Sequence, residues 1–440
     1  MKTFGGGAKV DTLIKNALLI TMEEGRQPIE NGCVYVEGST IAYAGSQDGL
    51  PEGLKPDDVI DAKGHVCMPG FINTHTHLPM TLFRGAAEDV PLDTWLKDVI
   101  WPMEARLNEG HVYWGSMLAL AELVRGGVTC VNDQYFFCDA IVEAASQAGM
   151  RAIIGRGLSD IALGGVEKLP EAEALFHKYN GMDGGRIRVS ICPHAEYTNS
   201  VSFLRKCAET AQKLGAPIHT HISETKKEHE ECIARHGMTP LALFDKLGCL
   251  EGTFMAAHCV WIEDSDLELM KEKGAGVLHC PGSNLKLGSG IARIEKMRQM
   301  GIKAGLGTDG AASNDNLSLW EEMSLCSFLQ KGVNNTPTAL PAEYALHMAT
   351  SGGAEALGLS KWLGTIEKGK KADIILIDTD QPHYYPRADM RKHLVYCGNS
   401  YDVRLTMIDG RVVFKDGEYL TLDIEKIYHS VQKSAEELRV

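Results

Sequence analysis

The sequence predicts an α/β protein: a TIM (β/α)8 barrel with a small β-sandwich domain built from both termini. Three observations lead to this fold class. Short apolar strands alternate with helix-period segments eight times across the middle of the 440-residue chain. Both ends contain short alternating strands with Gly, Pro and Asp turns. The hydrophobic fraction of 44% is sufficient for a large core.

The middle of the chain carries the barrel pattern. We expect its eight strands at Cys67–Thr74, Val128–Asn132, Ala152–Gly157, Ile187–Cys192, Ile218–Ile222, Phe254–Ala257, Gly276–His279 and Lys303–Gly307. Helix periodicity separates them, for instance at Glu109–Arg125, Val201–Leu214, Asp264–Lys273 and Ile291–Gln299. Repeated strand–helix units imply parallel strands, and eight such strands close a barrel.

The two ends of the chain form the second predicted domain. Strand-like segments occur at Thr12–Thr21, Gly32–Glu37, Ile41–Gly45, Val59–Asp61, Ala372–Asp378 and Val403–Ile408. Asp409–Gly410 and Asp416–Gly417 are hairpin turn signals. We therefore divide the chain into residues 1–66 and 363–440, which form the two parts of the sandwich, and 67–362, the barrel.

Charge and cysteine usage limit the class of protein. Lys plus Arg is 44 and Asp plus Glu is 58, a net charge of −14. This charge argues against binding to nucleic acid or to an anionic membrane. The twelve Cys form no CxxC pair, no signal peptide is visible in Met1–Val10, and no apolar run approaches roughly 20 residues. We expect a cytoplasmic protein with buried thiols, and leave open whether it forms a homo-oligomer.

Histidines gather where the predicted strands end. Seven of the 16 His lie at or just beyond a strand end: His75, His77, His194, His219, His221, His258 and His279. Asp309 follows the eighth strand. Barrel enzymes place their catalytic residues at these ends. Imidazole and carboxylate ligands suit a divalent ion, with Zn2+ as the default and Fe2+, Ni2+ or Mn2+ as alternatives.

The spacing of these histidines indicates which of them are the better candidates for metal ligands. His75 and His77 share one face of a strand, and so do His219 and His221. Glu224 follows His221 by three residues and could move protons in the site, which favours His221 as the ligand and leaves His219 a core or supporting role. For His279 a direct role and a packing role remain equally open. The fourth strand has no Lys to bridge two ions, so we expect one ion.

Nearly the whole chain resembles the amidohydrolase superfamily and, within it, the 5-methylthioadenosine/S-adenosylhomocysteine deaminase family. The motifs that carry this resemblance lie at residues 69–85, 101–104, 193–194, 219–225, 257–259, 284–287 and 307–310. The resemblance implies one divalent ion per subunit, held by His75, His77, His221 and Asp309. It also implies nucleoside contacts from Glu104, Arg156, His194 and Glu224. Trp95 either stacks on the base or packs in the core.

The expected reaction is hydrolytic deamination of an adenine nucleoside to the inosine-type product and ammonia. Asp309 would take a proton from the attacking water, Glu224 would protonate N1 of the base, and His258 would hydrogen-bond the oxygen that attacks C6. The candidate substrates are 5'-methylthioadenosine, S-adenosylhomocysteine, 5'-deoxyadenosine and adenosine. The family often has an Arg after a Gly-Gly pair beyond strand three, where this chain has Val166. This difference favours the smaller adenosines.

Two other hypotheses remain. The first is a deaminase or chlorohydrolase of another heterocycle, such as guanine, cytosine, a triazine or a pterin. Guanine deaminases tend to place a Gln shortly after the HxH pair, where this chain has Leu78-Pro-Met80. The second is a non-catalytic binding protein on the same fold, which we expect to have lost ligands that this chain retains.

Overall fold

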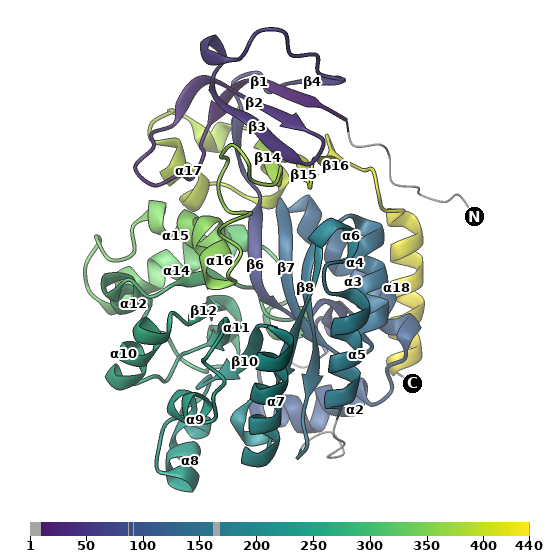
Figure 1. The fold of residues 1–440 in the computed structure, drawn as a ribbon, viewed down its shortest axis with the longest axis vertical. Helices are drawn as coiled ribbons and strands as arrows, with labels where there is room; N and C mark the ends of the chain where they lie inside the picture. Colours follow the sequence, from purple (N-terminus) through teal and green to yellow (C-terminus); the bar gives the residue numbers. More distant parts are fainter. Residues whose placement is uncertain (1–9, 87, 91, 162–167, 440) are drawn as a thin grey trace.

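The computed structural model describes residues 10–86, 88–90, 92–161 and 168–439. Eight parallel strands form a barrel at the centre of the molecule (Figure 1). In chain order they are β6 (Phe71–Thr76), β7 (Val128–Tyr135), β8 (Arg151–Leu158), β9 (Ile187–Pro193), β10 (Ile218–Ile222), β11 (Phe254–His258), β12 (Gly276–His279) and β13 (Ala304–Leu306). A bridge from Thr76 to Asp309 joins the last strand to the first. The predicted barrel is confirmed.

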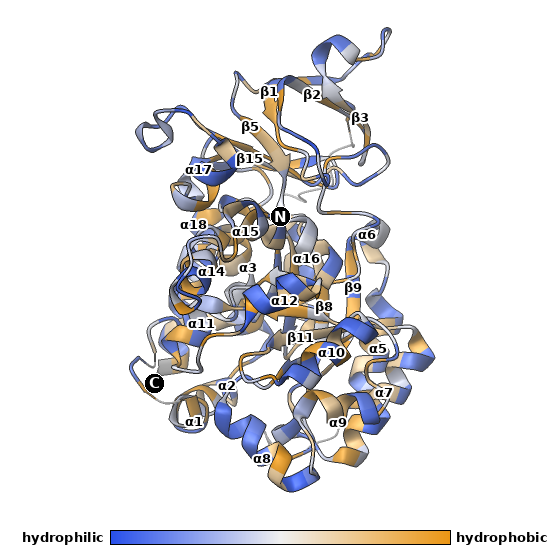
Figure 2. Cartoon of the chain, turned by 90° about the vertical axis from the view of Figure 1, so that its left-hand side faces the viewer, coloured by the Kyte–Doolittle hydropathy of each residue, from blue (hydrophilic) through white to orange (hydrophobic). Residues whose placement is uncertain are grey.

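Helices surround the barrel. Three of them, α3 (Glu109–Arg125), α7 (Val201–Leu214) and α10 (Asp264–Lys273), occupy the predicted residues. Ser200 caps α7 by accepting a hydrogen bond from the Phe203 amide at 3.2 Å, and Gly215 ends it with a φ of 64°. Figure 2 shows hydrophilic residues along outer helices such as α8 (Lys226–His236). The apolar faces of these helices therefore pack inward.

The other helices are short or cover the barrel ends. They include α1 (Leu92–Thr94), α2 (Trp101–Glu104), α4 (Cys138–Ala148), α5 (Leu169–Tyr179), α6 (Met182–Gly185), α9 (Pro240–Lys246), α11 (Pro281–Lys286), α12 (Ile294–Met300), α13 (Ala311–Asn314), α14 (Leu319–Val333), α15 (Ala342–Ala349), α16 (Ser351–Ala356) and α17 (Met390–Tyr396). Among the described residues, no helix is both long and apolar enough to cross a bilayer.

Both ends of the chain build a second sheet, as predicted. Its strand order is β17-β16-β15-β14-β5-β1-β2-β3, with β4 beside β1. The strands are β1 (Thr12–Leu19), β2 (Ile29–Glu37), β3 (Thr40–Ser46), β4 (Asp58–Asp61), β5 (Val66–Pro69), β14 (Ile374–Ile377), β15 (Val403–Ile408), β16 (Arg411–Lys415) and β17 (Glu418–Tyr419). Side chains from the two ends share one core, which contains Ile14, Leu19, Val34, Ile374, Leu405 and Met407.

The predicted first barrel strand, Cys67–Thr74, is wrong as a single strand. Its first half is β5, which pairs with β1 and β14 in the terminal sheet, and only its second half enters the barrel as β6. The chain changes sheets at Gly70, whose amide donates to the Asp373 carbonyl at 3.0 Å. A Cβ at Gly70 would lie 2.1 Å from the Thr129 side chain, so only glycine fits. The predicted boundaries after residues 66 and 362 stay a prediction.

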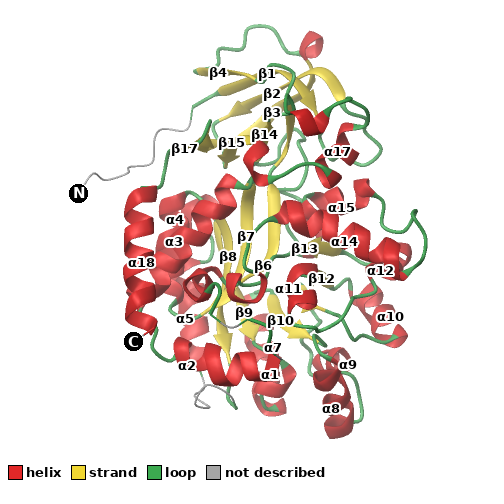
Figure 3. Ribbon diagram, turned by 180° about the vertical axis from the view of Figure 1, so that it is seen from behind, coloured by secondary structure: helices red, strands yellow, loops and turns green. Residues whose placement is uncertain are grey.

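The terminal segments contact the barrel and its helices in several places. Buried Arg151 of β8 donates to both carboxylate oxygens of Asp373, at 2.8 and 2.9 Å. The terminal helix α18 (Ile424–Arg439), which was missed by the sequence analysis, packs along α3 (Figure 3). An ion pair of 3.0 Å between His111 and Glu437 joins the two helices.

Candidate active site

The predicted metal ligands meet at the carboxyl ends of the barrel strands. The Nε2 atoms of His75 and His77 lie 3.4 and 3.2 Å from Oδ1 of Asp309. Candidate ligand atoms of His75, His77 and His221 lie within 4.8 Å of one another, and so do those of His75, His258 and Asp309. The structure therefore places His75 with His77 and His221 in one group, and with His258 and Asp309 in another.

Main-chain carbonyls orient two of these histidines. Nδ1 of His77 lies 2.6 Å from the Gln134 carbonyl oxygen, and Nδ1 of His221 lies 2.7 Å from that of His194. A carbonyl oxygen only accepts hydrogen bonds, so Nδ1 of each ring carries the proton. In the neutral form of each ring, Nε2 then has the lone pair that binds a metal.

Hydrogen bonds from neighbouring side chains also orient the other two candidate ligands, His75 and Asp309. Nδ1 of His75 lies 2.8 Å from Nε2 of His219, which gives His219 a supporting role. Oδ2 of Asp309 accepts hydrogen bonds from Ser283 at 2.7 Å and Ser313 at 2.8 Å. The remaining atoms, His75 Nε2 and Asp309 Oδ1, are buried and have no hydrogen-bond partner in the described part of the chain.

A divalent ion would provide a partner for both of these buried atoms, His75 Nε2 and Asp309 Oδ1. Ligand atoms about 2.1 Å from a tetrahedral ion lie about 3.4 Å from one another. The Nε2-to-Oδ1 separations of 3.4 and 3.2 Å match that spacing. The nitrogen and carboxylate donors therefore fit a single divalent ion in both chemistry and spacing.

His258 and Glu224 lie beside the ligand group. Nδ1 of His258 lies 2.8 Å from Oδ1 of Asn284, and its Nε2 lies 3.9 Å from Oε2 of Glu224. His258 and Asp309 both have left-handed backbone conformations, with φ of 69° and 58°. Such strain in non-glycine residues is typical of functional sites. Here it occurs at the ends of β11 and β13, where the two side chains meet the site.

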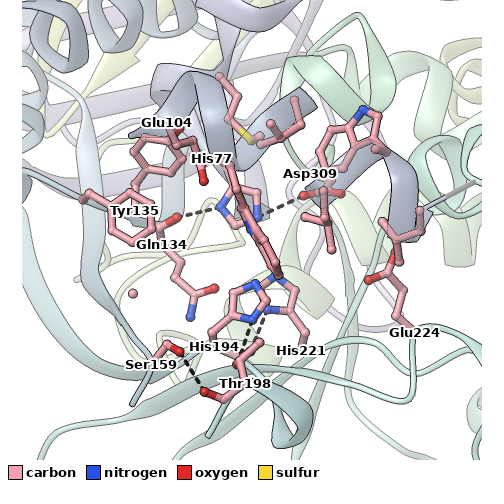
Figure 4. Close-up of a pocket in the computed structure, with 18 of the residues that line it drawn as sticks. His77, Glu104, Gln134, Tyr135, Ser159, His194, Thr198, His221, Glu224 and Asp309 are labelled. Carbon is pink, nitrogen blue, oxygen red and sulfur yellow. Dashed lines mark hydrogen bonds and ion pairs between the residues drawn. The ribbon is translucent and has the colours of Figure 1, made fainter. Parts of the chain in front are cut away.

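The ligand group forms part of the wall of a cavity of about 830 Å³, including its open mouth. Figure 4 shows Glu224 and Asp309 on one side of this cavity and Glu104, Tyr135 and Gln134 on the other. His77, His194 and His221 lie between the two sides (Figure 4). Trp95, which is buried, adds an apolar surface together with Leu92, Leu96, Ile100 and Trp101. A mostly apolar cavity with a few converging polar groups is typical of small-molecule sites.

Burial sets the protonation of the cavity residues. It raises the pKa of the Glu224 carboxyl, and it raises that of Glu104 to about 7, so Glu104 can hold a proton near neutral pH. It lowers the pKa of His194 to about 3, which keeps this ring neutral. Nδ1 of His194 also lies 3.1 Å from the Thr198 hydroxyl. Buried Glu228 accepts hydrogen bonds from the amides of Ser223 and Glu224, at 2.9 and 2.8 Å, and so fixes the turn that carries Glu224.

Two residues that the sequence made candidates for the site do not line the cavity. They are His279 and Arg156. His279 is buried, does not line the cavity and has no hydrogen-bond partner among the described residues. Arg156 lies in a neighbouring cleft, where its Nε is 3.3 Å from Glu171 and its guanidinium covers the Phe136 ring. Side chains alternate along β8, so Gly157 faces the cavity and Arg156 faces away. Its contact with the nucleoside stays a prediction, and Val166 lies outside the described residues.

Sequence analysis missed several supporting residues. Gln134 lines the cavity because β7 runs three residues beyond its predicted end, and a longer strand would have placed it at the barrel rim. Ser283, Ser313 and Glu228 follow the strands in loops and helix starts. No periodicity or spacing in the sequence distinguishes them from other polar residues.

This chain matches known proteins over the barrel and over the sheet that is built from the two ends of the chain. The amidohydrolase family model matches residues 66–413. A 5-methylthioadenosine/S-adenosylhomocysteine deaminase of Dictyoglomus thermophilum is 46% identical over 382 residues, covering 87% of this chain and 89% of that protein. A 5'-deoxyadenosine deaminase of Methanosarcina mazei is 42% identical over 430 residues, covering 97% and 98%. The crystal structure of an adenosine deaminase from Xanthomonas campestris with bound zinc matches with a TM-score of 0.94 and 32% identity over 98% of both chains.

Proposed function

The protein belongs to the amidohydrolase family, and from this premise we propose that it is a metal-dependent deaminase of adenine nucleosides. The products would be the inosine-type nucleoside and ammonia. One observation carries the proposal: the buried Glu224 carboxyl lines a cavity whose wall also includes the candidate ligands His77, His221 and Asp309. The names of the relatives, which are deaminases of adenosine and its 5' derivatives, agree with this chemistry.

We propose that His75, His77, His221 and Asp309 hold one divalent ion, Zn2+. Three imidazoles and a carboxylate suit zinc, and the adenosine deaminase from Xanthomonas campestris binds zinc. When bound, such an ion lowers the pKa of a coordinated water towards about 7 and supplies a nucleophile at neutral pH.

The chain's own groups then move the protons. Asp309 would accept a proton from the attacking water through Oδ1, because two serines occupy Oδ2. Glu224 would protonate N1 of the base, since its carboxyl lines the cavity beside His258 and burial raises its pKa. His258 would hydrogen-bond the oxygen that attacks C6, with Asn284 fixing the orientation of its ring. Together these contacts let C6 become tetrahedral without charge accumulating on the ring. Asp309 would then give its proton to the 6-amino group, the C6–N bond would break to release ammonia, and the proton lost from the C6 hydroxyl would restore Glu224.

The position of the base fixes the position of the sugar. In a purine, N9 lies at the opposite end of the ring system from C6 and N1. With C6 beside Asp309 and N1 beside Glu224, the ribose reaches the far side of the cavity, where Glu104 lies (Figure 4). An ionised Glu104 accepts a hydrogen bond from a sugar hydroxyl, His194 offers a neutral ring along the way, and Trp95 can stack on the base.

A second cleft bears on the 5' substituent. It shares Trp101 and Glu104 with the cavity and contains Arg156 and Lys168. Both cations pair with Glu171, at 3.3 and 2.6 Å. A substrate carboxylate would have to displace Glu171, whereas a methylthio group or hydroxyl would not. We therefore propose that 5'-methylthioadenosine, 5'-deoxyadenosine and adenosine are better substrates than S-adenosylhomocysteine.

All twelve cysteines are free and eleven of them are buried. Buried free thiols are typical of proteins in reducing compartments. We propose on this ground that the protein acts in the cytoplasm on small-molecule nucleosides.

A substrate screen tests the proposed function. The zinc-loaded protein is incubated with adenosine, 5'-methylthioadenosine, 5'-deoxyadenosine, S-adenosylhomocysteine and guanine, and ammonia release is measured. We expect turnover of the adenosines, with S-adenosylhomocysteine slowest and guanine inert. Turnover of guanine alone, or of none of these compounds, would refute the proposal. A faster rate with S-adenosylhomocysteine would refute the proposed preference for small 5' groups.

A further inference from the structure

We propose that Gln134 makes the enzyme selective for ribonucleosides by accepting a hydrogen bond from the 2'-hydroxyl; this inference rests on the proposed function. Gln134 lies near the end of β7 and its side chain lines the cavity. The residue is only 2% exposed. Figure 4 shows it between His194 and Tyr135, on the side of the cavity opposite Glu224.

The side-chain amide of Gln134 has one free acceptor. Its Nε2 donates to the main-chain oxygen of Cys192 at 3.3 Å. The Cys192 oxygen can only accept a hydrogen bond, so a flip of the Gln134 amide would break this bond. Its Oε1 is buried and has no hydrogen-bond partner among the residues that the structure describes. A buried acceptor without a partner is costly, so a ligand in the cavity is expected to supply a donor.

Few groups on an adenine nucleoside can donate there. The 6-amino group lies at the reacting end, beside Glu224 and Asp309. The remaining donors are the sugar hydroxyls, because N3 and N7 of the purine only accept. The 2'-hydroxyl is on the carbon next to the glycosidic bond and is therefore the hydroxyl nearest the base.

The main chain of Gln134 lies next to the reacting end of the cavity. Its own carbonyl oxygen holds Nδ1 of His77 at 2.6 Å, so its backbone contacts the ligand group directly. Glu104 comes from α2, outside the barrel strands. Gln134 therefore lies on the base side of the 2'-hydroxyl. Glu104 lies on the outer side of the sugar hydroxyls.

The test compares three substrates in the zinc-loaded enzyme and in Gln134→Met. Adenosine, 2'-deoxyadenosine and 3'-deoxyadenosine are used, and kcat/KM is measured for each. The wild-type enzyme is expected to prefer adenosine over 2'-deoxyadenosine by about tenfold or more, because the deoxy substrate leaves the buried acceptor unpaired. In Gln134→Met, we expect this preference to shrink to about twofold or less. The preference for adenosine over 3'-deoxyadenosine should be unchanged.

Two further measurements make the result decisive. Bound zinc in Gln134→Met shows whether the site is intact, since the main chain of Gln134 still holds His77. Gln134→Glu, which burial favours in the protonated form, can donate its O–H to the Cys192 carbonyl while keeping an acceptor oxygen, and should keep the preference for adenosine over 2'-deoxyadenosine. Equal turnover of adenosine and 2'-deoxyadenosine by the wild-type enzyme would overturn the inference. So would a Gln134→Met variant that binds zinc and keeps the preference. If the wild-type enzyme deaminates none of the three, the proposed function itself is wrong.

Discussion

Replacing Glu224 by Gln tests the proposed proton donor with almost no change in shape. Oε1 of Glu224 accepts from the Ser289 hydroxyl at 3.3 Å, a bond that the amide oxygen of Gln can also accept. The amide cannot transfer a proton to N1. General acid catalysis contributes about 10²- to 10⁴-fold, so kcat should fall by that factor, or about 2.7–5.4 kcal/mol in activation free energy. Glu224 belongs to neither group of candidate ligands, so metal content should not change.

The assay follows ammonia release from 5'-methylthioadenosine, with bound metal measured on the same sample. Glu230→Gln is the matched control, because Glu230 lies exposed on α8 and pairs only with Lys226 at 3.5 Å. This control should keep the wild-type kcat. A Glu224→Gln variant that retains kcat within about threefold would remove Glu224 from proton transfer. Loss of bound metal in that variant would show that Glu224 is a ligand.

Three other perturbations follow from the structure. His219→Leu removes the support behind His75 and should weaken metal binding by about 10- to 100-fold in a chelator competition; unchanged affinity would contradict that role. Arg151→Met leaves Asp373 buried and unpaired and should lower the free energy of unfolding by about 3–5 kcal/mol in urea; a loss below about 1 kcal/mol would refute the pair's importance. Glu104 has a pKa raised to about 7 by burial, so its ionised form is lost as pH falls through 7. KM should then rise, and a KM that is flat with pH would contradict the ribose contact.

Much of the barrel could be predicted because each unit carries its own signal. α7 combines a Ser cap, an apolar stripe and a terminal Gly, and the structure places its ends at the predicted residues. The split between β5 and β6 could not be predicted. Residues 66–76 form a continuous buried run, and local sequence does not show which sheet each half joins. α18 was missed because its partner surface on α3 lies some 300 residues away in the sequence.

The site was predictable where chemistry and strand ends coincide. His75, His77 and His221 share strand faces at the rim, and Asp309 ends the last strand, so topology alone brings them together. Supporting groups such as Ser283 and Glu228 depend on the path of each loop, which sequence does not fix. Arg156 shows the limit of placing residues by strand ends: it lies near the rim but on the outer face of β8.

The most direct test of the central claim is metal-dependent deamination by one preparation. The protein is treated with a chelator, and ammonia release from 5'-methylthioadenosine is measured before and after zinc is added in steps. The account predicts no turnover in the treated protein and full recovery at one ion per chain. Turnover by the metal-free protein would contradict the proposed function. An absence of turnover at every zinc content, with 5'-methylthioadenosine and adenosine present, would also contradict it.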